Sequence, residues 1–236
     1  MNKMKYSHEK SVENLFKENF SQAAISRGNV HIAASLDGQD RLVGADYLFT
    51  DSTTYAIVEF KNRESNLKSE AHKVKRHLLC QGLYFDLDAL VAHKKCHFAA
   101  WGEGQAAISI ESNIYYNEIC NADFWGPRFE YIDSADCTTR MTENDFIDRF
   151  LRGDEGAAIQ EFDAYIAWLL RLGDDSNTNG YLELLISNPY EHRSAGLVFT
   201  SIRSKHNWLE INRPTPANTD DFGFDTPSGP SSSLRP

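Results

Sequence analysis

Several features that mark whole classes of protein are missing from this sequence of 236 residues. It has no run of about 18 apolar residues, so no membrane-spanning helix is expected. Its first residues hold no apolar segment of the kind found in secretion signals. The four cysteines are widely spaced without a Cys-x-x-Cys pair, which predicts neither a zinc site nor a disulfide framework. These absences favour a cytoplasmic protein with no membrane partner.

Basic charge is also scarce, because 24 lysines and arginines face 34 aspartates and glutamates, giving a net charge of −10. A protein that binds bare duplex DNA through its whole surface is usually basic, so the overall balance argues against that kind of protein. The charge is uneven, however, and residues 61–80 hold six basic and two acidic side chains. For any single basic side chain in this patch, a solvated helix face is the alternative to a binding role.

The most informative stretch runs from residue 44 to residue 61 and predicts two strands joined by a turn. Apolar, aromatic and β-branched residues fill positions 42–49 and 55–60. Between them, Asp51, Ser52 and Thr53 are typical turn residues, because their short polar side chains bond to their own backbone. The sequence therefore predicts a β-hairpin.

Three charged side chains meet at one end of this hairpin. Strand side chains alternate in direction, so Glu59 and Lys61 share a face, and a tight hairpin places Asp46 beside Glu59. Two such carboxylates bind a hard cation such as Mg²⁺, which activates water for attack on a phosphate. An ammonium group can orient that water. The alternative is a salt bridge on a solvated sheet face, worth ~0–1 kcal/mol.

An Asp on one strand and Glu-x-Lys on the next, with a helix on either side, resembles the core of the restriction-endonuclease-like nucleases, the PD-(D/E)XK superfamily. The resemblance covers about residues 7–101. Asp46, Glu59 and Lys61 take the three motif positions, while Ala45 stands where the family name has proline. The resemblance implies an α/β fold with a mixed central sheet flanked by helices.

The same resemblance implies a catalytic site for Mg²⁺, which Mn²⁺ is able to replace. Asp46 and Glu59 would be direct metal ligands, and the backbone carbonyl of Phe60 would be a further ligand. Lys61 would position the attacking water.

Residues 7–26 are expected to form a helix, because their apolar side chains recur at helical spacing. The first helix of the superfamily often supplies an acidic residue to the metal site. This implies Glu13 as the first candidate for a further catalytic and metal-site residue, and Glu9 as the second. A solvated helix flank is the alternative for either residue.

The rest of the nuclease-like core is predicted to contain strands over residues 30–35 and 97–101 and a helix over residues 66–85. The second of these strands should run parallel to a core strand, because a helix connects the two. Gln81 is expected near the inner side of the helix, with a helix-terminal amide as the alternative. The inner stripe of the helix is expected to consist of Leu67, Ala71, Val74 and Leu78.

The second half of the chain matches no known pattern and is expected to form an α+β extension. The core is predicted over residues 1–120, the extension packed on it over 121–212, and a flexible Pro- and Ser-containing tail over 213–236. Within these parts the expected elements are a strand and turn over 106–120, helices over 142–150 and 155–172, and strands over 181–186 and 196–202.

Taken together, these features predict a metal-dependent endonuclease that hydrolyses phosphodiester bonds of DNA, with microbial anti-phage defence or restriction as the setting implied by the resemblance. The expected partners are DNA and either a second copy in a homodimer or a partner protein subunit. One alternative is a catalytically inactive nuclease-fold subunit that binds or scaffolds a larger complex. Another is an unrelated α/β binding protein with structural charges. The expected DNA contacts are Arg63, Lys68, Lys75 and Arg76.

Overall fold

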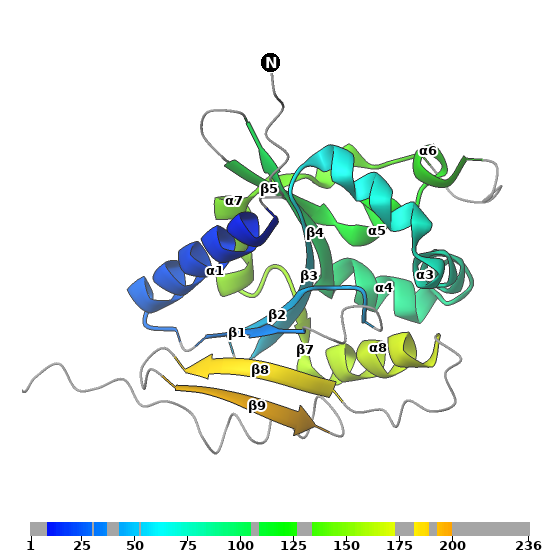
Figure 1. The fold of residues 1–236 in the computed structure, drawn as a ribbon. Helices are drawn as coiled ribbons and strands as arrows, with labels where there is room; N and C mark the ends of the chain where they lie inside the picture. The colour runs from blue at the N-terminus through cyan, green and yellow to red at the C-terminus, as the bar shows by residue number, and fades with distance from the viewer. Residues whose placement is uncertain are drawn as a thin grey trace, which may run out of the picture.

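A mixed open β-sheet with helices on both faces forms the fold (Figure 1). In a computed structural model, nine described strands share this sheet in the order β6-β5-β4-β3-β2-β1-β8-β9, with β7 paired to β3. The α/β class expected from the sequence is therefore confirmed. The structure describes residues 9–29, 31–36, 43–51, 53–104, 109–126 and 134–172, and the backbone of 182–188 and 193–199. The predicted tail over 213–236 lies outside the described residues.

Four strands make the centre of the sheet: β1 (Ile32–Ser35), β2 (Tyr47–Thr50), β3 (Thr54–Lys61) and β4 (His97–Glu103). β2 pairs antiparallel with β1 and with β3, whereas β4 runs parallel to β3. The parallel crossover and the predicted strands are confirmed, except that β2 begins at Tyr47 and not at residue 42 as expected. All eight residues of β3 are buried, because helices cover both of its faces.

The outer strands come from later parts of the chain than β1 to β4, and the strands after residue 120 join the same sheet as those before it. β5 pairs with β4, β7 pairs with β3, and β8 pairs with β1. These outer strands are β5 (Ser109–Ile114), β6 (Met141–Thr142), β7 (Ala157–Ala158), β8 (Leu182–Asn188) and β9 (Arg193–Phe199).

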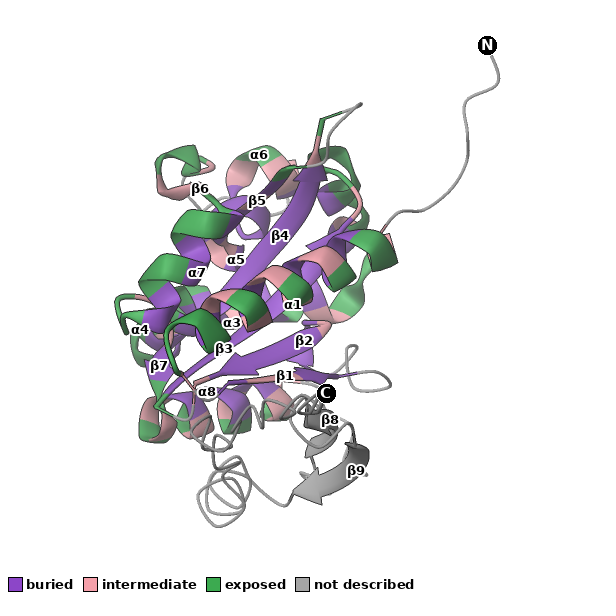
Figure 2. Ribbon diagram, turned by 90° about the vertical axis from the view of Figure 1, so that its left-hand side faces the viewer, coloured by how far each residue is buried: buried purple, intermediate pink, exposed green. Residues whose placement is uncertain are grey.

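One face of the sheet is covered by α1 (Glu9–Ser26) and α7 (Glu143–Leu151) (Figure 2). The predicted helices over 7–26 and 142–150 are therefore confirmed, with small differences at their ends. An aromatic cluster fills this interface, where the ring of Phe16 lies 5.2 Å from that of Phe60 and 5.6 Å from that of Phe146. Such edge-on and tilted ring pairs stabilise a core beyond the burial of their area. α1 is thereby fixed across the end of β3.

The opposite face carries the helices that connect β3 to β4, together with a helix from the second half of the chain (Figure 1). The crossover consists of a 3-10 helix, η1 (Glu64–His72), and two α-helices, α3 (Val74–Phe85) and α4 (Leu87–Cys96). The remaining helical elements are α5 (Tyr115–Ile119), α6 (Ala122–Trp125), the short 3-10 helix η3 (Cys137–Thr139) and α8 (Ile159–Arg171).

The prediction of one continuous helix over residues 66–85 is wrong. The chain turns as a 3-10 helix, then adopts an extended backbone at Lys73 (φ −90°, ψ 111°) before α3 begins. This break changes the direction in which later side chains point. Val74 and Leu78, expected in the inner stripe, are 78% and 37% exposed. Gln81, expected near the inner side, is also exposed.

The prediction that the cysteines form no disulfide is also wrong, because Cys80 of α3 is bonded to Cys120 at the end of α5. The two residues are 40 positions apart, so no short motif announces the pair. Disulfides are rare in reducing compartments, so the bond weakens the cysteine argument for a cytoplasmic protein. Cys96 and Cys137 are free. No helix among the described residues is long and apolar enough to cross a membrane.

Reduction of the Cys80–Cys120 bond is expected to lower the free energy of unfolding by ~2–4 kcal/mol, because the bond restricts the unfolded chain. The melting temperature should fall by several degrees when calorimetry is repeated with a reductant. Cys137→Ser, which removes an exposed free cysteine, should melt like the wild type and respond equally to the reductant. Four free thiols in the unfolded, untreated protein would contradict the bond.

Candidate active site

Glu59 and Lys61 lie at the end of β3, on the face that is covered by η1 and α3. They are only 1% and 5% exposed, so the alternative of a salt bridge on a solvated sheet face does not hold. The Lys61 ammonium donates hydrogen bonds to Oε1 of Glu59 at 2.5 Å and to the backbone carbonyl of Phe60 at 3.0 Å. The Glu-x-Lys pattern is therefore a buried ion pair.

Asp46 lies directly before β2, opposite Glu59 in the register that pairs Tyr47 with Val58. Its backbone N–H donates to the carbonyl of Val58 at 3.0 Å, and its carboxylate accepts from the backbone N–H of Phe60 at 2.6 Å. The hairpin thus brings Asp46 beside Glu59, as its register requires. Burial, followed by the negative charge of Glu59, raises the pKa of Asp46 to about 7.

Glu70 on η1 is a central residue of the site that the sequence did not indicate. It is fully buried, and Oε2 accepts hydrogen bonds from Nε of Arg76 at 2.8 Å and from the hydroxyl of Tyr115 at 3.0 Å. Its other oxygen lies 3.2 Å from the ammonium of Lys61. The available signal was its position as one of two acidic residues in the basic stretch 61–80.

Lys73 joins the two buried carboxylates from the solvent side. Its ammonium lies 3.0 Å from Oε1 of Glu59 and 2.7 Å from Oε1 of Glu70, while its side chain remains 42% exposed. Lys73 lies between the end of η1 and the start of α3. The helix break therefore directs its side chain toward the site. Both Lys61 and Lys73 therefore neutralise the same pair of carboxylates.

The pKa values at this cluster follow from burial and from these charges. Burial lowers the pKa of Lys61, but the carboxylates of Glu59 and Glu70 outweigh it and raise that pKa above its ordinary value. Burial and the nearby Glu70 raise the pKa of Glu59. Burial also favours a higher pKa for Glu70, but the surrounding cations, Lys61 first, hold it well below its ordinary value. Lys61 is thus firmly protonated and Glu70 firmly ionised.

Arg76 does not lie on the outer side of its helix, as its expected role in DNA contact required. It is 2% exposed and its guanidinium is bonded to Glu70. The guanidinium also packs on Gly44, where an added Cβ would lie 2.2 Å from Nη1 and the backbone φ is +79°. Gly44 precedes Asp46 by two positions, so Arg76 packs on the segment that leads through Asp46 into β2. The expectation that Arg76 contacts DNA is therefore wrong.

The first helix contributes its acidic residues at the margin of the cluster. Glu13 is buried, and its carboxylate pairs with the ammonium of Lys10 at 2.6 Å. Its negative charge adds to the raised pKa of Asp46 after burial and Glu59, and that of Glu9 adds to the raised pKa of Lys61 after Glu59 and Glu70. The solvated-flank alternative is thus wrong for Glu13, although its direct partner is Lys10.

The oxygen atoms that the motif predicts as metal ligands differ in how they are engaged. Oε2 of Glu59 is buried and has no hydrogen-bond partner. The carboxylate of Asp46 accepts from the backbone N–H of Phe60, and the carbonyl of Phe60 accepts from the ammonium of Lys61. Within the described residues no group of three or more His, Cys, Asp or Glu side chains is arranged around a metal position. Mg²⁺ retains waters and often uses only one or two carboxylates, which is the number that Asp46 and Glu59 offer.

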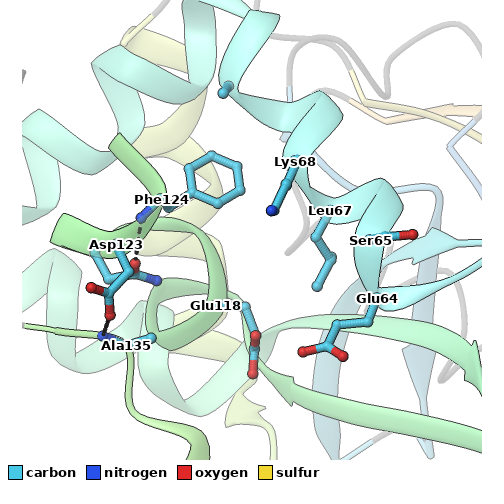
Figure 3. A pocket seen from close by; sticks show the side chains of 10 residues that line it. Glu64, Ser65, Leu67, Lys68, Glu118, Asp123, Phe124 and Ala135 are labelled. Carbon is cyan, nitrogen blue, oxygen red and sulfur yellow. Dashed lines mark hydrogen bonds between the residues drawn. The ribbon is translucent and has the colours of Figure 1, made fainter. Parts of the chain in front are cut away.

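The remaining expected DNA contacts lie on or near η1. Arg63 and Lys68 are exposed, and Lys75 is partly exposed. Lys68 faces a cavity of about 610 Å³ between η1 and α6, where it lies opposite Phe124 (Figure 3). Three carboxylates also line this cavity, and Asp46, Glu59 and Lys61 are not among its lining residues. The cavity is therefore a neighbour of the candidate site and not part of it.

Comparisons with known proteins found no matching family model, no matching curated protein and no matching solved structure. What the site does is therefore inferred from its own residues and their geometry.

Asp46→Asn is expected to stabilise the protein above pH 7. The wild-type carboxyl has a pKa near 7 when folded and about 4 when unfolded, so folding takes up a proton between these values. The wild type therefore loses stability as the pH rises from about 4 to 7, and the amide removes this loss. At pH 8 we expect a gain of at least ~1 kcal/mol, or about 2–4 °C in melting temperature. Glu18→Gln, at an exposed site on α1, should follow the wild type.

Glu70→Gln is expected to lower the free energy of unfolding by ~3–5 kcal/mol, because it leaves buried cations without their partner. The matched control is Glu64→Gln on the same helix, which weakens an ion pair of 2.7 Å between Arg140 and the half-exposed Glu64. Its expected effect is ~0–1 kcal/mol. Chemical denaturation measures both. Equal effects of the two substitutions would argue against a buried network that depends on Glu70.

Proposed function

We propose that this protein is a metal-dependent nuclease that hydrolyses phosphodiester bonds of DNA. The observation that carries the proposal is the convergence of Asp46, Glu59 and Lys61 at the end of β3, with Asp46 and Glu59 opposite each other. The order of elements supports a restriction-endonuclease-like core. A helix is followed by three antiparallel strands, then by helices that cross to a parallel strand.

Asp46, Oε2 of Glu59 and the carbonyl of Phe60 are the atoms that would hold Mg²⁺ or Mn²⁺. When bound, the cation lowers the pKa of a bound water and offsets negative charge on the phosphate. After burial and the charge of Glu59, the charge of Glu13 adds to the raised pKa of Asp46, so Glu13 remains the proposed further acidic residue of the site. The carboxylate of Asp46 must lose its proton to act as a ligand, so metal affinity should fall as the pH drops below about 7.

Lys61 would orient the attacking water and stabilise negative charge on the phosphate. Its three N–H donors already face Glu59, Glu70 and the carbonyl of Phe60, so the water would have to replace one of these contacts. Glu70 is a positioning residue in this scheme, because it fixes Lys61 and is itself fixed by Arg76 and Tyr115. The Lys61 ammonium is thus held by residues that are themselves fixed.

DNA would approach along η1, where the chain leaves β3. Arg63, Lys68 and Lys75 remain proposed phosphate contacts, and Lys73 joins them because it is exposed beside the carboxylates. This local surface would let an acidic protein bind DNA. Restriction or anti-phage defence remains the proposed setting, by resemblance alone.

A catalytically inactive nuclease-fold subunit is the second candidate, and one observation favours it. The cations of Lys61, Lys73 and Arg76 already neutralise Glu59 and Glu70. A cluster with its charges balanced internally can serve structure without any metal. Divalent-metal binding separates the two candidates, because the inactive subunit has no need of it.

Mg²⁺ or Mn²⁺ is expected to raise the melting temperature of the wild type and of Lys61→Met, but not of Asp46→Ala, because only a protein that binds the ion is stabilised by it. In a plasmid-nicking assay both variants should lose activity at least ~100-fold, since an ammonium or a metal ligand is missing. Lys95→Met is the matched control, because it removes a half-exposed lysine paired with Glu161 on the far helices.

Two outcomes would contradict the proposal. Cleavage by Lys61→Met at the wild-type rate would show that Glu-x-Lys is a structural ion pair only. A wild-type melting curve that neither cation shifts would instead favour the inactive subunit.

A further inference from the structure

Three cations surround two buried carboxylates at the candidate site, so one cation is in excess. The carboxylates belong to Glu59 and Glu70. The cations, each within 3.2 Å of at least one of them, are those of Lys61, Lys73 and Arg76. These five side chains together carry one more positive than negative charge. Because like charges repel, a cluster in this state disfavours the binding of a further cation.

Lys73 is the cation that the two carboxylates can lose. Without it, Glu59 keeps the ammonium of Lys61 at 2.5 Å. Glu70 keeps the guanidinium of Arg76 at 2.8 Å and the ammonium of Lys61 at 3.2 Å. The large cost of a buried carboxylate arises when its charge is left uncompensated. Both carboxylates thus remain paired when Lys73 moves away.

Lys73 is also the cation that is able to move. Its side chain is 42% exposed, whereas those of Lys61 and Arg76 are buried. Its backbone is held in place, because its N–H donates to the carbonyl of Glu70 at 3.0 Å and its carbonyl accepts from the N–H of Arg76 at 2.9 Å. Rotation of the flexible four-carbon stem is therefore enough to carry the ammonium into solvent. The movement requires no change in the fold.

A phosphate group is the anion that would draw Lys73 away from the carboxylates. Lys73 lies on the solvent side of the cluster, between η1 and α3. Arg63 and Lys68 are exposed on the same stretch of chain, and both are proposed phosphate contacts. A DNA backbone that follows this surface brings negative charge to the exposed side of the Lys73 ammonium. An ammonium binds phosphate as a point charge, so the contact requires no fixed geometry.

We propose that Lys73 is an exchangeable counter-ion, which neutralises Glu59 and Glu70 in the protein without DNA and transfers to a phosphate when DNA binds. Its departure removes positive charge from the surroundings of Oε2 of Glu59, a buried oxygen with no hydrogen-bond partner among the described residues. DNA and a divalent cation then bind cooperatively, and each raises the affinity of the protein for the other by the same factor. This inference rests on the proposed nuclease function.

Two binding measurements on the full chain, made at a single pH, test the exchange. Titration calorimetry with Mn²⁺ in the absence of DNA measures the metal affinity. Fluorescence anisotropy of a short labelled duplex in the presence of EDTA measures the DNA affinity without cleavage. For Lys73→Met we expect the dissociation constant for Mn²⁺ to fall at least about fivefold, because the competing charge is gone. The dissociation constant for the duplex should rise severalfold, because a phosphate contact is lost.

Three further variants show whether these two effects belong to Lys73. Lys73→Gln removes the charge but keeps a hydrogen-bond donor, and it should change both affinities as Lys73→Met does. Lys68→Met removes an exposed lysine of η1 that lies outside the cluster, so it should weaken duplex binding and leave the Mn²⁺ affinity unchanged. Lys95→Met removes a half-exposed lysine that is paired with Glu161, and it should change neither affinity.

The outcomes separate this inference from the proposed function. If the wild type binds Mn²⁺ and both Lys73 variants bind it with equal or lower affinity, the exchange is overturned and the proposed metal site stands. If neither the wild type nor either Lys73 variant binds Mn²⁺, both proposals are overturned. Duplex binding that both Lys73 variants leave unchanged would also overturn the exchange, because no phosphate would then receive the ammonium.

Discussion

The burial of two carboxylates at the end of β3 is the constraint on which the rest of this structure depends. Removing an ion from water costs several kcal/mol, and a single ion pair often fails to offset that loss. Here Glu59 and Glu70 share the cations of Lys61, Lys73 and Arg76. Each of these cations comes from β3, from the end of η1 or from α3, so the electrostatic balance fixes the relative position of all three elements.

The helix break at Lys73 connects this balance to the outer surface. An unbroken helix would place Val74 and Leu78 inside, as their spacing suggested, and would turn Arg76 outward. The extended residue instead turns Arg76 toward Glu70 and leaves Val74 and Leu78 outside. The same backbone feature thus completes the charged cluster and exposes two apolar side chains.

The predictable part of the fold was the part governed by short-range alternation. Strand periodicity and turn residues indicated β1 to β4, and hairpin register brought Asp46 to Glu59. Glu70 and the Cys80–Cys120 bond could not be predicted in this way, because each depends on how the crossover folds back over the sheet. The spacing of apolar residues could not show which side of α3 is buried, because the buried side includes Arg76, a charged residue.

The pairing of β7 with β3 also determines when this fold can form. Thr54 and Tyr55 take their partners, Ala158 and Ala157, from about a hundred residues later in the chain. Gly156 reaches back as well, and its backbone N–H donates to the carbonyl of Lys95 at 2.8 Å. Closing so long a loop is slow, because its entropy is lost before the stabilising contacts form. During synthesis, β3, the strand that carries the candidate site, would therefore lack its partner β7 until most of the protein had been made.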